Sequence, residues 1–346
     1  MRVGEAQEVA RAWVRAEAGT MPGFWGAFYH GSTTWLPADA MLPPASDVDV
    51  MVVLTDTAPP PKLGKMRYRG VLLDVAYLSR DEVASPEAVL VSSHLAGSLR
   101  GPSIIADPSG DLARLQAVVA AEFAQRRWVQ QRCEHVQAKI FGHLQALDAA
   151  APFPDQVVPW LFATGLTTHL LLVAGLRNPT VRQRYPAVRD LLAEYGQADF
   201  YPALLDLLGC REMSQAQAER HLDALAQVFD ATAAIIKSPF VFAADLSAAA
   251  RPVAIDGSRE LIARGDQREA IFWMVATYSR CAHVLDRDAP AALRDRFAPG
   301  YRRLLGDLGI ESFADLAQRS AALPAFLPRL WAVAEAIMAA NPAVHA

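Results

Sequence analysis

The chain has 346 residues, of which 52% are hydrophobic and 20% charged, and its formal net charge at neutral pH is −4. This length allows two domains with substantial cores, and the composition excludes a disordered chain. The small acidic excess argues against a long nucleic acid as partner, because proteins that bind one usually carry a basic excess.

The three cysteines and the apolar segments predict where the protein works. Cys133, Cys210 and Cys281 are far apart and have no metal-type spacing, so we expect buried thiols in a reducing compartment. The N-terminus has no basic region followed by an apolar core, and apolar runs such as 170–174 are too short to span a bilayer. We therefore expect a cytoplasmic protein without a membrane partner.

The first part of the chain alternates helical and strand patterns. Residues 5–18 carry an apolar stripe at helical spacing, with Val9, Trp13 and Ala16 on one face. The segments that follow are predicted as a strand at 24–29, a glycine turn at 30–34, a strand at 46–53, a polar proline-rich loop at 56–65, a strand at 67–78, a helix at 81–94 and an edge strand at 103–106. The turn Asp107-Pro108-Ser109-Gly110 closes this part.

Almost every later segment predicts helix. A long stretch with few helix breakers runs from 111 to about 150, and Pro, Gly or Asn-Pro separates the remaining helices. These cover 156–175, 180–195, 215–236, 258–285, 291–305 and 325–339. The predicted fold class is therefore α/β (α+β), with a domain of residues 1–110 built on a small mixed sheet and a larger all-helical domain of residues 111–346.

Two carboxylates stand at the start of the second predicted strand. Because strand side chains alternate, Asp47 and Asp49 point to one side, whereas Val48 and Val50 point into a core. Nothing near the two acids in the sequence neutralises them, and such a pair is costly unless a cation joins it. Paired oxygen ligands of this kind suit the Mg²⁺ that accompanies nucleotide phosphates.

A glycine turn and a third acid accompany this pair. Gly31 follows an apolar strand, so that backbone N–H groups can approach an anion closely, and Ser32 can cap a helix or hydrogen-bond a phosphate. His30 is expected to position the turn rather than to react. Asp74 stands among apolar residues of the third predicted strand, where an unpaired acid would be costly to bury.

The ordered set of Gly31-Ser32, Asp47-Val48-Asp49 and Asp74 resembles the signature of the DNA polymerase β-like nucleotidyltransferase superfamily. The resemblance covers residues 24–78. It implies two Mg²⁺ ions, Asp47, Asp49 and Asp74 as metal ligands and catalytic residues, and Gly31 and Ser32 as binders of the triphosphate. Asp74 would also accept the proton of the attacking hydroxyl. One departure is the long segment from Gly31 to Asp47, which contains three prolines and predicts only a short helix after the turn.

In its size, its net acidity and its helical second part, the chain most resembles the aminoglycoside and lincosamide nucleotidyltransferases of that superfamily. The implied reaction moves a nucleoside monophosphate, AMP in the first instance, from an NTP to a hydroxyl of a small antibiotic-like acceptor and releases pyrophosphate. Two alternatives stay open. One is transfer to tRNA or protein, as in toxin-type enzymes, and the other is a non-catalytic nucleotide-binding regulatory module.

Three further features concern charged residues. The basic stretch from Lys62 to Arg69 is either a solvated hairpin or a mobile arm that holds a triphosphate or an acidic substrate. Arg182 follows the helix start at Asn178-Pro179, and in the enzymes that the chain resembles the helical domain commonly supplies a basic residue to the nucleotide phosphates. Arg182 is our first choice for that role. Glu134 is the alternative general base.

Overall fold

A computed structural model describes all 346 residues and divides them into two compact units. The first unit comprises Met1–His135, Leu176–Thr180 and Ala343–Ala346, and the second comprises Val136–Gly175 and Val181–Pro342. The first contains a small mixed sheet and the second is helical, so the coarse fold class predicted from the sequence is confirmed.

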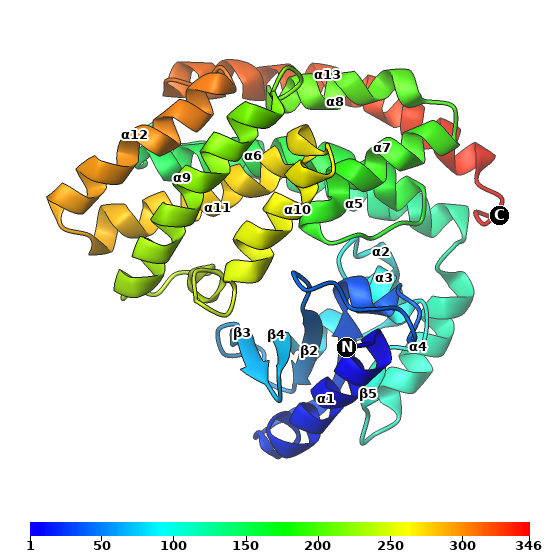
Figure 1. The fold of residues 1–346 in the computed structure, drawn as a ribbon. Helices are drawn as coiled ribbons and strands as arrows, with labels where there is room; N and C mark the ends of the chain where they lie inside the picture. Colours follow the sequence, from blue (N-terminus) through cyan, green and yellow to red (C-terminus); the bar gives the residue numbers. More distant parts are fainter. The chain divides into compact units, whose positions relative to one another are not determined.

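A five-stranded sheet forms the centre of the first unit (Figure 1). Its strands are β1 (Phe24–His30), β2 (Val48–Leu54), β3 (Gly64–Tyr68), β4 (Val71–Ser79) and β5 (Ile104–Ala106). They follow the order β3-β4-β2-β1-β5, in which β2 and β4 are parallel and the other neighbours are antiparallel. The helices of this unit are α1 (Val3–Ala16), α2 (Pro86–Val91), α3 (Ala96–Leu99), α4 (Asp111–Glu122) and the first half of α5 (Arg126–Gln145).

The strand predicted at 67–78 is two strands. A tight turn at Arg69 and Gly70, whose φ angles are 47° and 84°, separates β3 from β4 and pairs them as a hairpin. Gly70 adopts this backbone conformation without steric cost, which explains the position of the turn. The prediction of a single strand at 67–78 was therefore wrong, because the turn signal at Gly70 was not counted.

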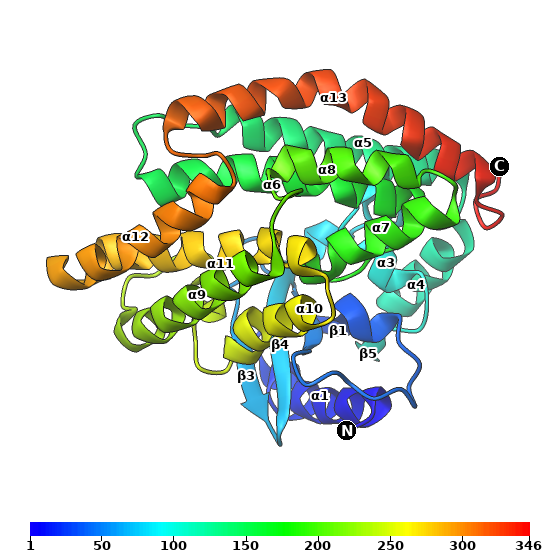
Figure 2. The ribbon, with the colours of Figure 1, turned by 45° about the horizontal axis from the view of Figure 1, so that its top comes forward.

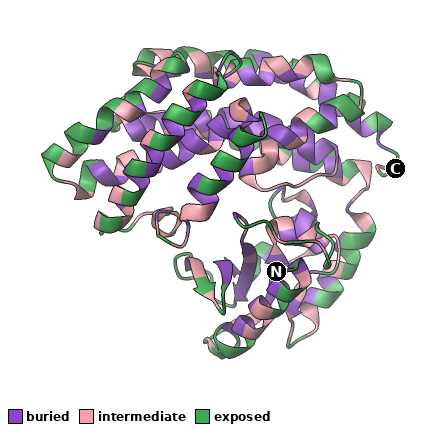
Figure 3. Cartoon of the chain, in the orientation of Figure 1, coloured by how far each residue is buried: buried purple, intermediate pink, exposed green.

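Apolar residues cover both faces of the sheet, which is buried at its centre (Figure 3). Val48, Val50 and Val52 are fully buried on the face that α1 covers, as the alternation in the sequence predicts. Met51 and Val53 point to the opposite face, where they pack with residues of α2 and α4. The first unit is therefore a sheet between two helical layers.

Helix α4 belongs to the sheet unit and not to the helical unit. Leu112, Leu115 and Val119 on its apolar face are buried in the same cluster as Phe28 of β1. The compact units therefore divide later than the predicted boundary at residue 110. The helix predicted from 111 to about 150 is also interrupted, since α4 ends at Glu122 and α5 begins at Arg126.

The second unit is built from long helices around α6 and α11 (Figures 1 and 2). Its helices after α5 are α6 (Phe153–Ala174), α7 (Arg184–Glu194), α8 (Tyr201–Leu208), α9 (Gln215–Ile235), α10 (Gly257–Ala263), α11 (Gln267–Asp288), α12 (Ala291–Asp307) and α13 (Phe313–Ala340). The helix predicted at 258–285 is interrupted at Gly265, whose φ is 91°. Helix α8 was not predicted, and α13 begins before the predicted residue 325.

Two helices of this unit are long and apolar enough to cross a membrane by length and composition, contrary to the expectation from the short apolar runs. The most apolar 18-residue window of α6 has a mean hydropathy of 1.7, and 83% of it is buried. The corresponding window of α13 has a mean hydropathy of 1.3, and 44% of it is buried. A helix surrounded by other helices is hydrophobic on all sides, which accounts for the composition of α6. These two helices are weak evidence for a membrane protein.

The position of α4 predicts the effect of shortening its buried side chains. Leu112 is fully buried and packs tightly on Gly26 of β1, since a methyl group added to Gly26 would lie only 2.5 Å from Leu112 Cδ1. Leu112→Ala should therefore leave a cavity and lower the free energy of unfolding by about 2–5 kcal/mol. Val118, on the same helix, is 40% exposed, and Val118→Ala should change it by less than about 0.5 kcal/mol. Urea denaturation measures both, and equal effects would contradict the assignment of α4 to this core.

Candidate metal centre

The register of the sheet places four polar residues in one row across it. His30 of β1 pairs with Asp49 of β2, Asp49 pairs with Asp74 of β4, and Asp74 pairs with Lys65 of β3. Directly opposed residues point to the same face of a sheet. The backbone therefore brings two carboxylates, a lysine and a histidine together, although they span 45 positions of the sequence.

Three carboxylates form a compact triad at this place. Asp47, Asp49 and Asp74 each offer one carboxylate oxygen, and these oxygens lie within 4.8 Å of one another. Asp47 and Asp74 are only 7% and 6% exposed. Carboxylate oxygens at this spacing suit a hard divalent cation, and the triad could hold a metal ion.

Two lysines already contact the triad. The ammonium group of Lys65 lies 2.5 Å from Asp74 Oδ2 and 2.7 Å from Asp47 Oδ2, and that of Lys62 lies 2.8 Å from the Asp74 carboxylate. The Lys65 side chain is only 8% exposed, whereas that of Lys62 is 35% exposed. The basic stretch is thus a hairpin in which these two residues contact acids.

The role of Lys65 was missed in the sequence, although a signal for it exists. A tight turn at Arg69 and Gly70 pairs Tyr68 with Val71, and counting outward from there pairs Lys65 with Asp74. The register could therefore have been obtained by counting from the turn.

The pKa values of Asp49 and Asp74 shift in opposite directions. Burial opposes the charge of Asp74, but Lys65 and Lys62 outweigh it and lower the pKa of that carboxyl. Burial raises the pKa of Asp49 well above its usual range, and the neighbouring charges of Asp47 and Asp74 raise it further. A cation bound at the triad would lower the pKa of Asp49 again, because it would favour the ionised form of this carboxyl.

The Gly31-Ser32 turn lies against the triad. The φ angle of Gly31 is 66°, and a Cβ atom at this residue would lie 1.9 Å from Asp49 Oδ2, so only glycine leaves room for the carboxylate. The Oγ atom of Ser32 is buried and has no hydrogen-bond partner. A buried hydroxyl without a partner is unfavourable, and an anion or a metal-bound ligand at this turn would relieve it.

His30 is held by groups beside the turn. Its Nδ1 atom lies 2.6 Å from Ser98 Oγ, and its ring packs on that of His94 at 4.5 Å between centroids. Burial, with the charge of His94, lowers the pKa of His30 well below its usual range. The neutral ring fits the positioning role expected from the sequence.

Two further residues named from the sequence are not part of the triad. Arg182 belongs to the helical unit, where it is 9% exposed and packs closely on Gly257. Its contact with nucleotide phosphates stays a prediction. Glu134 is exposed on α5 and accepts a hydrogen bond from Gln130, so its role as a base also stays a prediction.

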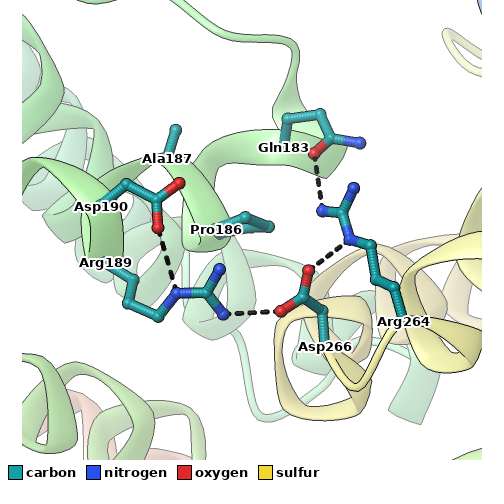
Figure 4. A pocket seen from close by; sticks show the side chains of 7 residues that line it. All are labelled: Gln183, Pro186, Ala187, Arg189, Asp190, Arg264 and Asp266. Carbon is teal, nitrogen blue, oxygen red and sulfur yellow. Dashed lines mark hydrogen bonds and ion pairs between the residues drawn. The ribbon is translucent and has the colours of Figure 1, made fainter.

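The helical unit contains a second charged region, around a depression of about 520 Å³ beside α7 (Figure 4). Asp266 contacts the guanidinium groups of Arg189, at 2.6 Å, and Arg264. Arg189 also lies 3.4 Å from the buried Glu269, and Arg264 contacts Gln183. Asp190 pairs with Arg189 as well, so each carboxylate of this network contacts an arginine, and the network connects helices.

Comparison with known proteins adds no relative. No family model, curated protein or solved structure matches the chain. The geometry of the acidic triad and of the turn beside it therefore carries the functional conclusion.

The contact of Gly31 with Asp49 can be tested with two alanine substitutions. Gly31 and Gly70 both have positive φ, so alanine strains the backbone by about 1–2 kcal/mol at either position. Only at Gly31 does the new methyl group displace a carboxylate, because the surroundings of Gly70 are open. Gly31→Ala should weaken Mn²⁺ binding by about 10–100-fold, the scale for disturbing the support of a metal ligand, and Gly70→Ala should leave it unchanged. Calorimetric titration measures both; equal affinities would contradict the assignment.

Proposed function

We propose that the protein is a metal-dependent nucleotidyltransferase that moves a nucleoside monophosphate from an NTP to a hydroxyl group. The main support is the juxtaposition of three carboxylates within 4.8 Å with a glycine turn whose Ser32 hydroxyl lacks a partner. The mixed sheet with helices on both faces is compatible with the catalytic domain of the DNA polymerase β-like superfamily, which the motifs resemble.

In this proposal each group at the site has a separate task. Asp47 and Asp49 would hold Mg²⁺, and the Gly31-Ser32 turn would bind phosphate oxygens of the NTP through its backbone and hydroxyl. When bound, Mg²⁺ would neutralise the triphosphate and favour departure of pyrophosphate. The Ser32 hydroxyl would then donate a hydrogen bond to a phosphate oxygen and so gain the hydrogen-bond partner that it lacks.

The proposed reaction needs one proton acceptor. The acceptor oxygen forms a bond to the α-phosphorus, the bond from that phosphorus to the bridging oxygen breaks, and pyrophosphate leaves with the electron pair. The proton of the acceptor hydroxyl moves to Asp74, which is ionised because Lys65 and Lys62 lower the pKa of this carboxyl. Positioning and charge neutralisation supply most of the catalysis in such transfers.

The proposed acceptor is a small cationic molecule of the aminoglycoside or lincosamide type, with ATP as the first nucleotide to test. The net charge of −4 favours a cationic acceptor over a nucleic acid. Incubation of the protein with Mg²⁺, each of the four NTPs and a panel of such antibiotics should produce an acceptor whose mass has increased by one nucleotide. If tRNA or protein is labelled instead, the acceptor class is wrong although the chemistry stands.

Removing one charge from the triad should abolish the reaction. Asp49→Asn keeps the shape of the side chain but weakens the cation site, so turnover should fall at least about a thousandfold, which corresponds to about 4 kcal/mol of lost transition-state stabilisation. Asp39 is exposed in the chain segment that connects Ser32 to Asp47, and Asp39→Asn is the matched control that should retain parental turnover. An Asp49→Asn protein with near-parental rate would exclude the triad as the catalytic centre.

The role of Asp74 as proton acceptor predicts a different pattern. Asp74→Asn should still bind Mg²⁺ and NTP, but transfer should be at least about a hundredfold slower, the scale for losing a general base. Nucleotide binding by calorimetry and single-turnover rates separate the two effects. Parallel loss of binding and rate would make Asp74 a metal ligand alone, and full activity would transfer the role of base to another residue such as Glu134.

A further inference from the structure

Lys65 occupies the space between two of the three acids. Its ammonium group contacts Asp74 at 2.5 Å and Asp47 at 2.7 Å, and its side chain is only 8% exposed. Lys62 contacts Asp74 as well. Lys65 thus stands where a cation shared by Asp47 and Asp74 would stand.

The backbone holds Lys65 in this position. It lies on β3 directly opposite Asp74 on β4, and the turn at Arg69 and Gly70 fixes that register. A shift by one residue would turn Lys65 to the other face and bring Met66 or Gly64 opposite the acid. The ammonium group is therefore part of the folded sheet, unlike a surface lysine that meets an acid by chance.

The charges around the triad favour one further divalent cation rather than two. Three carboxylates and two ammonium groups leave one formal negative charge. A divalent ion between Asp47 and Asp49 more than balances this charge. A second ion between Asp47 and Asp74 would have to share its place with the Lys65 ammonium, and the two cations would repel each other strongly in a buried site.

We propose that Lys65 replaces the second metal ion of a two-metal site, so that the protein binds one divalent cation per chain and Lys65 positions Asp74. This rests on the proposed metal centre and revises the two ions that the resemblance implies. Lys65 acts here as a positioning residue, since it contacts Asp47 and Asp74 and holds their carboxylates where an ion would otherwise hold them.

Counting bound Mn²⁺ on the full chain tests this directly. The spin-resonance signal of free Mn²⁺, measured in a titration at neutral pH without nucleotide, gives the number of ions bound per chain. We expect one ion for the parent protein and two for Lys65→Met, because removing the ammonium group opens the place between Asp47 and Asp74. Lys65→Arg keeps the charge and should bind one ion.

Lys62→Met is the matched control. It also removes one lysine from Asp74, but it leaves Lys65 bridging the two acids, so it should bind one ion. Two ions on the parent protein would overturn the inference while leaving the metal centre intact, and this count does not depend on whether any variant folds. One ion on a folded Lys65→Met would overturn it as well. No ion on any variant would overturn the metal centre itself, and with it the proposed function.

Discussion

The direct pairing of Asp49 with Asp74 in two neighbouring parallel strands is the constraint on which the site depends. Two acids opposite each other are unfavourable in an ordinary sheet, because like charges on one face repel. The valines of β2 maintain this pairing, since a shift by one residue would remove Val48 and Val50 from the core beneath α1 and turn Asp49 into it. The hydrophobic effect that stabilises the sheet thus also holds the carboxylates together.

The lysines of the β3–β4 hairpin make this arrangement tolerable within the folded protein. A buried carboxylate without a partner is strongly destabilising, and Lys65 and Lys62 provide that partner for Asp74. Asp49 has no such contact, and burial with two neighbouring acids raises its pKa. The lysines therefore do not compensate the three acids equally. Asp49, which has no lysine contact, lies against the Gly31 turn, where the buried Ser32 hydroxyl also lacks a hydrogen-bond partner.

In the charged network of the helical unit, by contrast, each acid is paired with an arginine. Asp266 is shared by Arg189 and Arg264, and although burial opposes its charge, the two arginines lower the pKa of this carboxyl. Glu269 and Asp190 also contact Arg189, so each acid of the network has an arginine as partner. The metal centre therefore differs from a structural network in that one acid, Asp49, has no ion-pair partner, and not in the number of charged residues.

The sequence by itself determined the order of strands and helices in outline, the three acids and the glycine turn, because alternation along a strand and the steric freedom of glycine are local properties. Local glycine signals for the turn at Arg69 and Gly70 and for the interruption at Gly265 are present but were not counted, whereas the burial of α4 on the sheet depends on which segments pack together. Counting from the turn at Gly70 pairs Lys65 with Asp74, but the second contact of Lys65, with Asp47, was decided only by the tertiary structure. A turn fixes the register of a hairpin, but the contact with Asp47 also requires β2 to pair with β4, and this pairing joins segments that are far apart in the chain.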